Sequence, residues 1–367
     1  MVKSKLRKYI FMGPLAPPFT GQSVAFTTFV GAVKDKLNYK VLNISNRNNI
    51  SCSIFLYFEI IVNIIFKNTD AIYFTCSRTL FGSTRDVLLL FLSRLKQIRV
   101  VNHLHGSDFK EFYRSLPKVY RKLLYWCYSG IDTTIILTEG MEEEFTDFPK
   151  MKTIVISNCY SNELDNLPKR KDVIDLEVHL LYFSNIMRSK GIIHLLKACD
   201  ILFSKHNNLK LDIAGNLLGD SISSLKEIST DFFDLLKILQ LKYPERIKYY
   251  GESKGMHKTQ LLWQSDIFIL PTFYRTEAFP ISILEAMRAG NYILSTNHRY
   301  IPQIITKQNG SLVEAKSTIE IINEVEKVIS NITKMRQIQN NNILHVIKNY
   351  NEEKYVKSIC DILETNN

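Results

Sequence analysis

Short apolar runs alternate with longer amphipathic segments throughout the chain, and this alternation limits the possible folds more than any other feature. The pattern is typical of parallel sheets wound with helices, because each pair of parallel strands needs a crossover connection. We expect six strands in each half, at residues 9–12, 40–44, 71–74, 99–103, 133–137 and 153–156, then 179–184, 210–214, 247–250, 266–270, 292–295 and 311–313. Since the two series share one rhythm, the sequence predicts an α/β protein with two Rossmann-like, doubly wound domains.

Domain organisation follows from the same pattern and from one polar stretch. Residues 162–175 are polar and charged and contain Pro168, so we place a linker there. The segment 333–364 is expected to be helical. The expected domains and terminal helix are 1–165, 176–345 and 346–367, the last packing back on the first domain. Ligands of open parallel sheets bind at the carboxyl ends of strands, so a central cleft faced by both domains is the expected site.

Several motifs that would point to other chemistry are absent from the sequence. There is no Gly-x-Gly and no Gly-Lys, which excludes the usual dinucleotide fingerprint and the P-loop. There is no Asp-x-Asp, His-Glu-x-x-His or Cys-x-x-Cys. His103 and His105 alternate without a third candidate ligand nearby. We therefore expect no metal site.

Charge and hydropathy bear on partners and location. The formal net charge of +11 favours anionic partners. The basic N-terminus is followed too soon by glycine and prolines to be a signal peptide. The most apolar run, 54–66, contains Glu59 and Asn63 and is shorter than the ~20 residues of a spanning helix. We expect it to be a buried helix or one facing a membrane surface, in a cytoplasmic protein.

The strongest candidate site is the segment 266–290, which has the pattern strand, loop, helix. Pro280 suits the first helical turn, and the backbone amides just before and after it would be free to bind phosphate or sugar oxygens. Glu277 precedes the helix, and Glu285 lies inside it among apolar neighbours. A buried carboxylate needs donors, which sugar or ribose hydroxyls would supply. The alternative is that Glu285 is exposed and Glu277 caps the helix.

This segment resembles the Glu-x7-Glu signature of retaining glycosyltransferase family 4, part of the glycosyl transferases group 1, which has the GT-B fold. The spacing of Glu277 and Glu285 matches, and so do the preceding Asp-Ile-Phe-Ile-Leu-Pro and the following Glu-Ala-Met-Arg-Ala-Gly. The resemblance implies that Glu277 lies by the donor sugar and that Glu285 holds the ribose diol of the nucleotide. It also implies that the turn of Ala278, Phe279 and Pro280 faces the donor.

A second resemblance lies at 181–191, after the first strand of the second domain. Family members usually show Gly-Arg and then Lys-Gly, and this chain keeps Lys190 before a glycine but has Asn185 where arginine is common. The resemblance implies that Lys190 neutralises the donor diphosphate, in place of a metal ion. Arg188 is a candidate for the missing charge, and the alternative is that it is an exposed loop cation.

The first domain resembles the family more weakly. Gly21 lies in a proline-rich loop after the first strand, where family members pack a glycine-bearing loop over the diphosphate. His105, in His-Gly-Ser-Asp, matches the histidine that hydrogen-bonds the donor sugar near the reaction centre. The alternatives are a plain connection and a structural histidine. The loop 296–303 departs from the family, because His298, Arg299 and Gln303 replace the usual glycines and glutamate.

Basic and aromatic residues interleave over 109–126, which suits an interfacial helix near anionic lipid. No nucleic-acid fold signature accompanies them, so we expect no nucleic-acid partner. An ordinary surface helix is the alternative. With many lipid-linked substrates in the family, we expect peripheral contact at the inner face of the plasma membrane.

The resemblance as a whole implies a retaining, metal-independent transferase of the hexosyltransferase type. Its co-substrate would be a nucleotide-diphosphate-sugar bound by the second domain, with no other cofactor. Its acceptor would be a saccharide, or a lipid-linked one, on the side of the first domain, in surface polysaccharide biosynthesis. Two alternatives stay open: a nucleotide-sugar epimerase on the same fold, and a non-catalytic binding protein with that fold.

Overall fold

The computed structural model describes residues 7–45, 50–168 and 177–365, without the side chains of residues 50–53. The chain divides into two compact units, Met1–Asn158 with Glu352–Asn367, and Cys159–Asn351. The first unit thus ends before residue 165, the expected end of the first domain, and includes the last helix of the chain. The predicted linker residues 169–175, the basic residues 1–6 and the last two residues lie outside the described ranges.

The first unit is built on a six-stranded parallel sheet with the strand order β2-β1-β3-β4-β5-β6. The strands are β1 (Lys8–Gly13), β2 (Asn38–Asn43), β3 (Ala71–Thr75), β4 (Arg99–His103), β5 (Thr133–Ile136) and β6 (Thr153–Val155). Every residue of β3 is buried, as expected for a central strand covered on both faces. The core contains a cluster of aromatic residues, with the rings of Phe11, Phe29 and Tyr73 in mutual contact.

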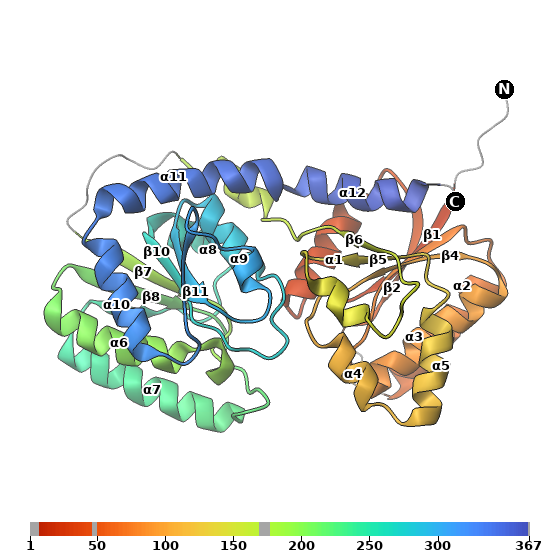
Figure 1. Ribbon diagram of the computed structural model, residues 1–367, viewed down its shortest axis with the longest axis horizontal. Coiled ribbons are helices and arrows are strands. Elements are labelled where there is room, and N and C mark those ends of the chain that lie inside the picture. The colour runs from red at the N-terminus through yellow and green to blue at the C-terminus, as the bar shows by residue number, and fades with distance from the viewer. Residues whose placement is uncertain (1–6, 46–49, 169–176, 366–367) are drawn as a thin grey trace. The chain divides into compact units, whose positions relative to one another are not determined.

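Helices from the red-to-yellow part of the chain, joined by the blue last helix, flank this sheet (Figure 1). They are α1 (Gly21–Ala32), α2 (Ile50–Ile65), α3 (Leu80–Leu95), α4 (Phe109–Ser115), α5 (Lys118–Tyr128) and the returning α12 (Glu352–Glu364), with a 3-10 turn η1 (Met141–Phe145). Helix α3 packs between α2 and α5, and α12 packs on α1. The Tyr355 hydroxyl of α12 donates a hydrogen bond to the Ala25 carbonyl of α1 at 3.3 Å.

The second unit repeats the plan, with a parallel sheet in the order β12-β11-β10-β7-β8-β9. The strands are β7 (Val178–Phe183), β8 (Leu209–Ala214), β9 (Ile247–Tyr249), β10 (Ile267–Leu270), β11 (Tyr292–Thr296) and β12 (Gly310–Val313). The helices are α6 (Ile192–Lys205), α7 (Leu225–Lys242), α8 (Gly255–Gln264), α9 (Ile281–Arg288), α10 (Thr318–Ile329) and α11 (Ile332–Asn349), with 3-10 turns η2 (Asn162–Asn166), η3 (Arg188–Lys190) and η4 (Ile301–Gln303). All twelve predicted strands are confirmed within two residues at either end.

The helical segment expected at 333–364 is interrupted, and its terminal helix begins at Glu352, not at residue 346 as expected. Helix α11 ends at Asn349 and α12 begins at Glu352. The Asn349 and Asn351 side-chain amides donate to the carbonyls of His345 and Ile347, each at 2.9 Å, and compete with helical hydrogen bonding. The Tyr350 carbonyl accepts from the Tyr160 amide at 3.1 Å instead of continuing the helix.

The most apolar run of the sequence lies in α2, and only one side of it is buried. Leu56, Ile60 and Ile64 face the core, whereas Phe55 and Phe58 are exposed. The expectation of a buried helix therefore holds for one side of α2 only, and the exposed side is apolar too. Within the described ranges, every helix is either too short or too polar to cross a bilayer.

Candidate active site

The carboxyl ends of β7 and β10 lie next to each other, since the two strands pair in parallel. The loops that follow them are tied together by the Phe273 amide, which donates to the Ser189 carbonyl at 2.7 Å. Gly191 makes this approach possible: it has φ +79°, and a Cβ there would lie 2.0 Å from the Pro271 carbonyl oxygen. The contact brings Lys190 to Glu277 across 87 positions of sequence.

Lys190 and Glu277 form a largely buried ion pair at this edge of the sheet. The Lys190 Nζ lies 2.5 Å from Glu277 Oε2, which also accepts from the Thr272 hydroxyl at 3.0 Å. The ammonium group lies 5.0 Å from the ring centroid of Tyr274. Desolvation offsets much of the attraction in such a pair, so its contribution to stability is small. The arrangement holds a cation and a carboxylate in fixed positions where ligands of parallel sheets bind.

Glu285 is buried in α9 and paired with a lysine that the sequence analysis missed. Its side chain is 5% exposed, so the alternative of a solvent-exposed glutamate is wrong. Lys258 of α8 donates to Oε1 at 2.5 Å. Donors from a sugar or ribose are therefore not required to compensate its burial. No spacing in the sequence links α8 to α9, so only the tertiary fold could reveal this pair.

The start of α9 offers backbone amides without a side-chain cap. Pro280 is the N-cap residue, one position before the first turn in which we expected it, and a proline side chain accepts no hydrogen bond. Ala278 and Phe279, on the turn that leads into the helix, are buried. Glu277 directs its carboxylate to Lys190 and Thr272, so the alternative that it caps α9 is wrong. The positive end of the helix dipole is thus available to an anion.

Arg188 and Asn185 flank this site in different ways. The Arg188 guanidinium pairs with Asp231 of α7, so it is neither free nor a simple exposed loop cation. The Asn185 carbonyl accepts from the Tyr182 hydroxyl at 2.9 Å, and the Asn185 side chain is partly exposed. A Cβ at Gly215 would lie 1.8 Å from the Ser184 carbonyl oxygen, so β8 closely supports the backbone just before Asn185.

The loop after β11, where the sequence departs from its resemblance, touches the same site. His298 lies with Nε2 at 2.9 Å from the Tyr274 carbonyl oxygen. Arg299 adopts φ +49°, a left-handed conformation that few non-glycine residues take. His298, one of the departing residues, therefore contacts the loop that presents Glu277.

His105 of the first unit is held as a neutral imidazole. Burial, and secondly the positive charge of Arg78, lower its pKa to about 3. Its ring lies against that of His103, with centroids 3.9 Å apart and the ring planes tilted by 34°, and neither ring nitrogen has a hydrogen-bond partner among the described residues. His103 itself is bound by the Tyr73 hydroxyl at 2.7 Å. A neutral His105 can both donate and accept a hydrogen bond but cannot supply a proton near pH 7.

Gly21, also on the first unit, opens α1 directly after the N-cap Thr20. Apart from its chain neighbours and the backbone of its own helix, no atom lies within 4 Å of a Cβ built there, so the fold itself does not require glycine at this position. In the part of the chain that the structure describes, no group of three His, Cys, Asp or Glu side chains is placed to hold a metal ion.

Comparison with known proteins decides the family of the second unit. A sequence model of the family described as glycosyl transferases group 1 matches residues 165–346. Residues 165–346 belong to the glycosyl transferases group 1. This group 1 region contains Lys190, Glu277 and Glu285, and the resemblance found in the sequence is confirmed at this level. Assignment to family 4 stays a prediction.

A curated relative and several solved structures are similar to the chain. The amylovoran biosynthesis glycosyltransferase AmsK of Erwinia amylovora is 28% identical over 134 residues, 35% of this chain and 30% of that protein. The structure of Alr3699/HepE of Anabaena in complex with UDP has a TM-score of 0.74 at 15% identity, over 97% of this chain and 99% of that one. Sucrose-phosphate synthase of Thermosynechococcus elongatus has a TM-score of 0.70 at 14% identity, over 97% and 98%. These likenesses confirm the predicted GT-B fold.

Proposed function

We propose that this protein is a glycosyltransferase that moves a sugar from a nucleotide-diphosphate-sugar to a saccharide acceptor. The observation that carries the proposal is the Lys190–Glu277 pair, held where β7 and β10 end. Family membership supports it. So do the complexes of the Anabaena protein, whose crystals contained UDP or UDP-glucose, and the role in amylovoran biosynthesis that the name of the Erwinia relative states.

The chemistry follows from the charges of the site. A bound diphosphate would attract the Lys190 ammonium group and lengthen its contact with Glu277. The Glu277 carboxylate oxygen released in this way would accept hydrogen bonds from hydroxyl groups of the donor sugar. Lys190 and the amides at the start of α9 would stabilise the charge that develops on the leaving diphosphate. Glu285 would bind the ribose, and Arg188 would add charge by exchanging Asp231 for phosphate.

The remaining assignments come from the sequence resemblance and extend this proposal. Asn185 would line the diphosphate, with Ala278, Phe279 and Pro280 along the donor. On the first unit, the neutral His105 would hydrogen-bond the sugar and Gly21 would allow the diphosphate to approach closely. We further propose a hexosyl transfer with retention of anomeric configuration and without a metal ion. The acceptor would be lipid-linked, and the protein would act in the cytoplasm at the inner face of the plasma membrane.

An acceptor-dependence assay tests the proposal and separates it from its alternatives. Purified protein is incubated with labelled UDP-, GDP- and ADP-sugars, with and without a set of saccharide and lipid-linked acceptors. Release of nucleoside diphosphate that requires an acceptor is the expected result. Conversion of the donor sugar without any acceptor would show an epimerase instead. Binding without turnover, with every donor and acceptor, would favour the non-catalytic alternative.

The Lys190→Met variant makes the same assay specific for the site. We expect its turnover to fall by about a hundredfold or more, the usual effect of removing one group that stabilises charge in a transition state. Lys226→Met, an exposed lysine on α7, is the matched control and should keep full turnover.

A further inference from the structure

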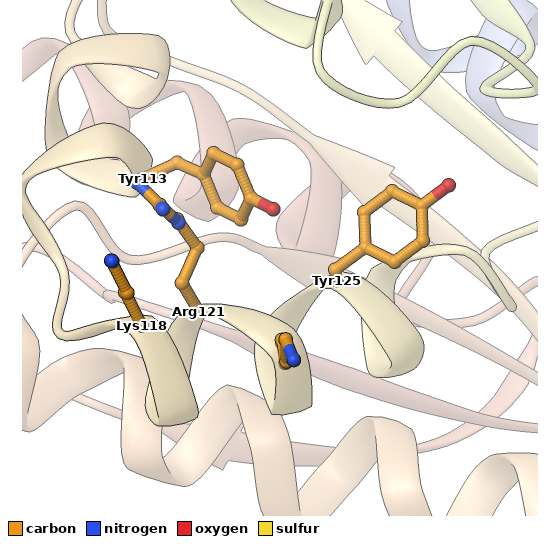
Figure 2. Close-up of a pocket in the computed structure, with 5 residues that line it drawn as sticks. Tyr113, Lys118, Arg121 and Tyr125 are labelled. Atoms are coloured by element: carbon orange, nitrogen blue, oxygen red, sulfur yellow. The ribbon is translucent and has the colours of Figure 1, made fainter.

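A pocket of about 330 Å³ lies on the first unit where α4 leads into α5. It is lined by Tyr113, Lys118, Arg121, Lys122 and Tyr125. Figure 2 shows Lys118 and Arg121 rising from α5 on the side where the Tyr113 ring lies. The rings of Tyr113 and Tyr125 both pack against Phe148, with centroids 4.8 and 5.4 Å apart, so the aromatic floor of this cationic pocket is fixed by the core.

The positions of the three cations of the cationic pocket destabilise helix α5 when no anion is bound. They occupy the first two turns of α5, where the helix dipole disfavours positive charge, and there is no acidic residue in the first turn. Lys118 and Lys122 are four positions apart, a spacing at which like charges repel each other. A bound anion would turn both effects into stabilising ones, because its negative charge would interact with the positive end of the helix dipole and with the cations at once.

Among the described residues, no carboxylate forms an ion pair with a cation of this pocket. Asp147 lies near the pocket: after burial, its negative charge is the next cause of the raised pKa of Tyr113. Its carboxylate is, however, paired with the Arg114 guanidinium at 2.8 Å. Lys118 and Lys122 have no hydrogen-bond or ion-pair partner among the residues that the structure describes. Arg121 donates to the backbone carbonyl of Arg114 at 3.3 Å, which leaves its charge uncompensated.

An exposed apolar stripe runs along α5 beside the cationic pocket. Val119, Leu123 and Trp126 are spaced i, i+4 and i+7 and therefore share one face of the helix, with Val119 83% exposed. Helix α3 extends the stripe, because Phe91 packs on Trp126 with ring centroids 5.7 Å apart and Leu95 is also exposed. Apolar groups next to unpaired cations at a helix start match the surface of an anionic lipid layer, with acyl chains beside phosphates.

We propose that the cationic pocket binds the phosphate headgroup of an anionic phospholipid while the apolar stripe of α5 enters the membrane interface. A free phosphate compound would use the cations but would leave the stripe in water, so the two features together favour a lipid surface. The inference specifies the site of the membrane contact that the proposed function includes. It does not depend on glycosyl transfer, and its failure would leave that activity untouched.

Vesicle flotation tests the proposal directly. The full-length protein is mixed with vesicles of phosphatidylglycerol and phosphatidylcholine, or of phosphatidylcholine alone, at moderate salt. We expect binding to the anionic vesicles only. The triple variant Lys118→Gln/Arg121→Gln/Lys122→Gln should bind them on the order of a hundredfold more weakly, since each cation near an anionic surface contributes roughly fivefold.

Matched variants separate the pocket from net charge and from folding. Lys226→Gln/Lys237→Gln/Lys248→Gln removes three exposed lysines of the second unit and should bind like the wild type. Val119→Ser/Leu123→Ser keeps the charges and should also weaken binding to the anionic vesicles. Circular dichroism confirms that each variant is folded. Equal loss in the triple variant and its charge-matched control would overturn the proposal, as would anionic-vesicle binding that the triple variant retains.

A soluble competitor distinguishes a lipid headgroup from free phosphate. Glycerol 3-phosphate is titrated into the protein by calorimetry and into the vesicle assay. Weak or undetectable binding with persistent vesicle binding supports the lipid site. Saturable binding of glycerol 3-phosphate by a protein that fails to bind the anionic vesicles would show a site for a soluble phosphate compound and contradict the proposal.

Discussion

At the scale of single residues, the second unit keeps two buried carboxylates, each with its own lysine. Lys190 pairs with Glu277 and Lys258 with Glu285, both at 2.5 Å. The first pair lies where a ligand can separate it, and the second fixes a carboxylate inside α9. Removing one member of such a pair leaves an uncompensated buried charge, whereas removing both does not.

Lys258→Met should therefore lower the free energy of unfolding of the second unit by about 3–5 kcal/mol. The double variant Lys258→Met/Glu285→Leu should recover most of that loss, because no charge is then left buried. Urea unfolding measures both in a Trp126→Phe background, in which Trp263 fluorescence reports on the second unit. A double variant as unstable as the single one would show that Lys258 acts through packing and not through its charge.

His105 gives a prediction about pH. Its pKa in the folded state is lowered to about 3, so the unfolded chain takes up the proton first as pH falls below the usual value near 6.5. The stability that comes from keeping His105 neutral in the folded state is fully present above pH 6.5 and is lost progressively as the pH falls towards 3. Between pH 7 and pH 5 it amounts to about 2 kcal/mol.

The His105→Gln variant should remove this part of the pH dependence and leave the part due to His103. Unfolding of the first unit is followed by Trp126 fluorescence in a Trp263→Phe background. We expect the variant to lose less stability than the wild type between pH 7 and pH 5. If the free energy of unfolding falls by the same amount in both proteins between pH 7 and pH 5, His105 takes up its proton in the folded state as well.

At the scale of elements, the close approach of the β7 and β10 loops depends on Gly191. Gly191→Ala should destabilise the second unit by about 2–5 kcal/mol, from left-handed strain and a clash with the Pro271 carbonyl. Gly251 is a matched control, since it has φ +66° but nothing within 4 Å of its Cβ position, and Gly251→Ala should cost only the ~1–2 kcal/mol of strain. If urea unfolding shows that Gly191→Ala and Gly251→Ala lower the free energy of unfolding equally, the close approach of Gly191 to Pro271 is not needed for stability.

The returning helix α12 is the second element whose role can be tested. Ile359 is completely buried in the first unit, and Ile359→Ala should lower its free energy of unfolding by about 2–5 kcal/mol. Lys357→Ala, on the exposed side of the same helix, should leave the transition unchanged. The Trp126 signal measures both. An unaffected transition in Ile359→Ala would mean that α12 does not contribute to the stability of the first unit.

At the scale of the whole molecule, the sequence predicted the features that are local and missed those that depend on distant partners. Buried parallel strands such as β3 and β10 are continuous apolar runs, and the regular spacing of these runs also located the more exposed strands β2, β6 and β9. The spacing of Glu277 and Glu285 was visible because both lie on one short segment. The partners Lys258 and Asp231 were not, since they lie on other helices far along the chain. The end of α11 was missed because it depends on asparagine side chains bonding back to the helix.

The central claim is that the second unit binds a nucleotide sugar with Glu285 in its site. Calorimetry with a panel of UDP-, GDP- and ADP-sugars tests it on the wild type, on Glu285→Gln and on Glu245→Gln, an exposed control. We predict that one donor binds, and that Glu285→Gln alone weakens binding by at least about tenfold, since a hydrogen bond to a charged group contributes about 1.5–3 kcal/mol. No binding of any donor to the wild type, or equal affinity in Glu285→Gln, would contradict the account.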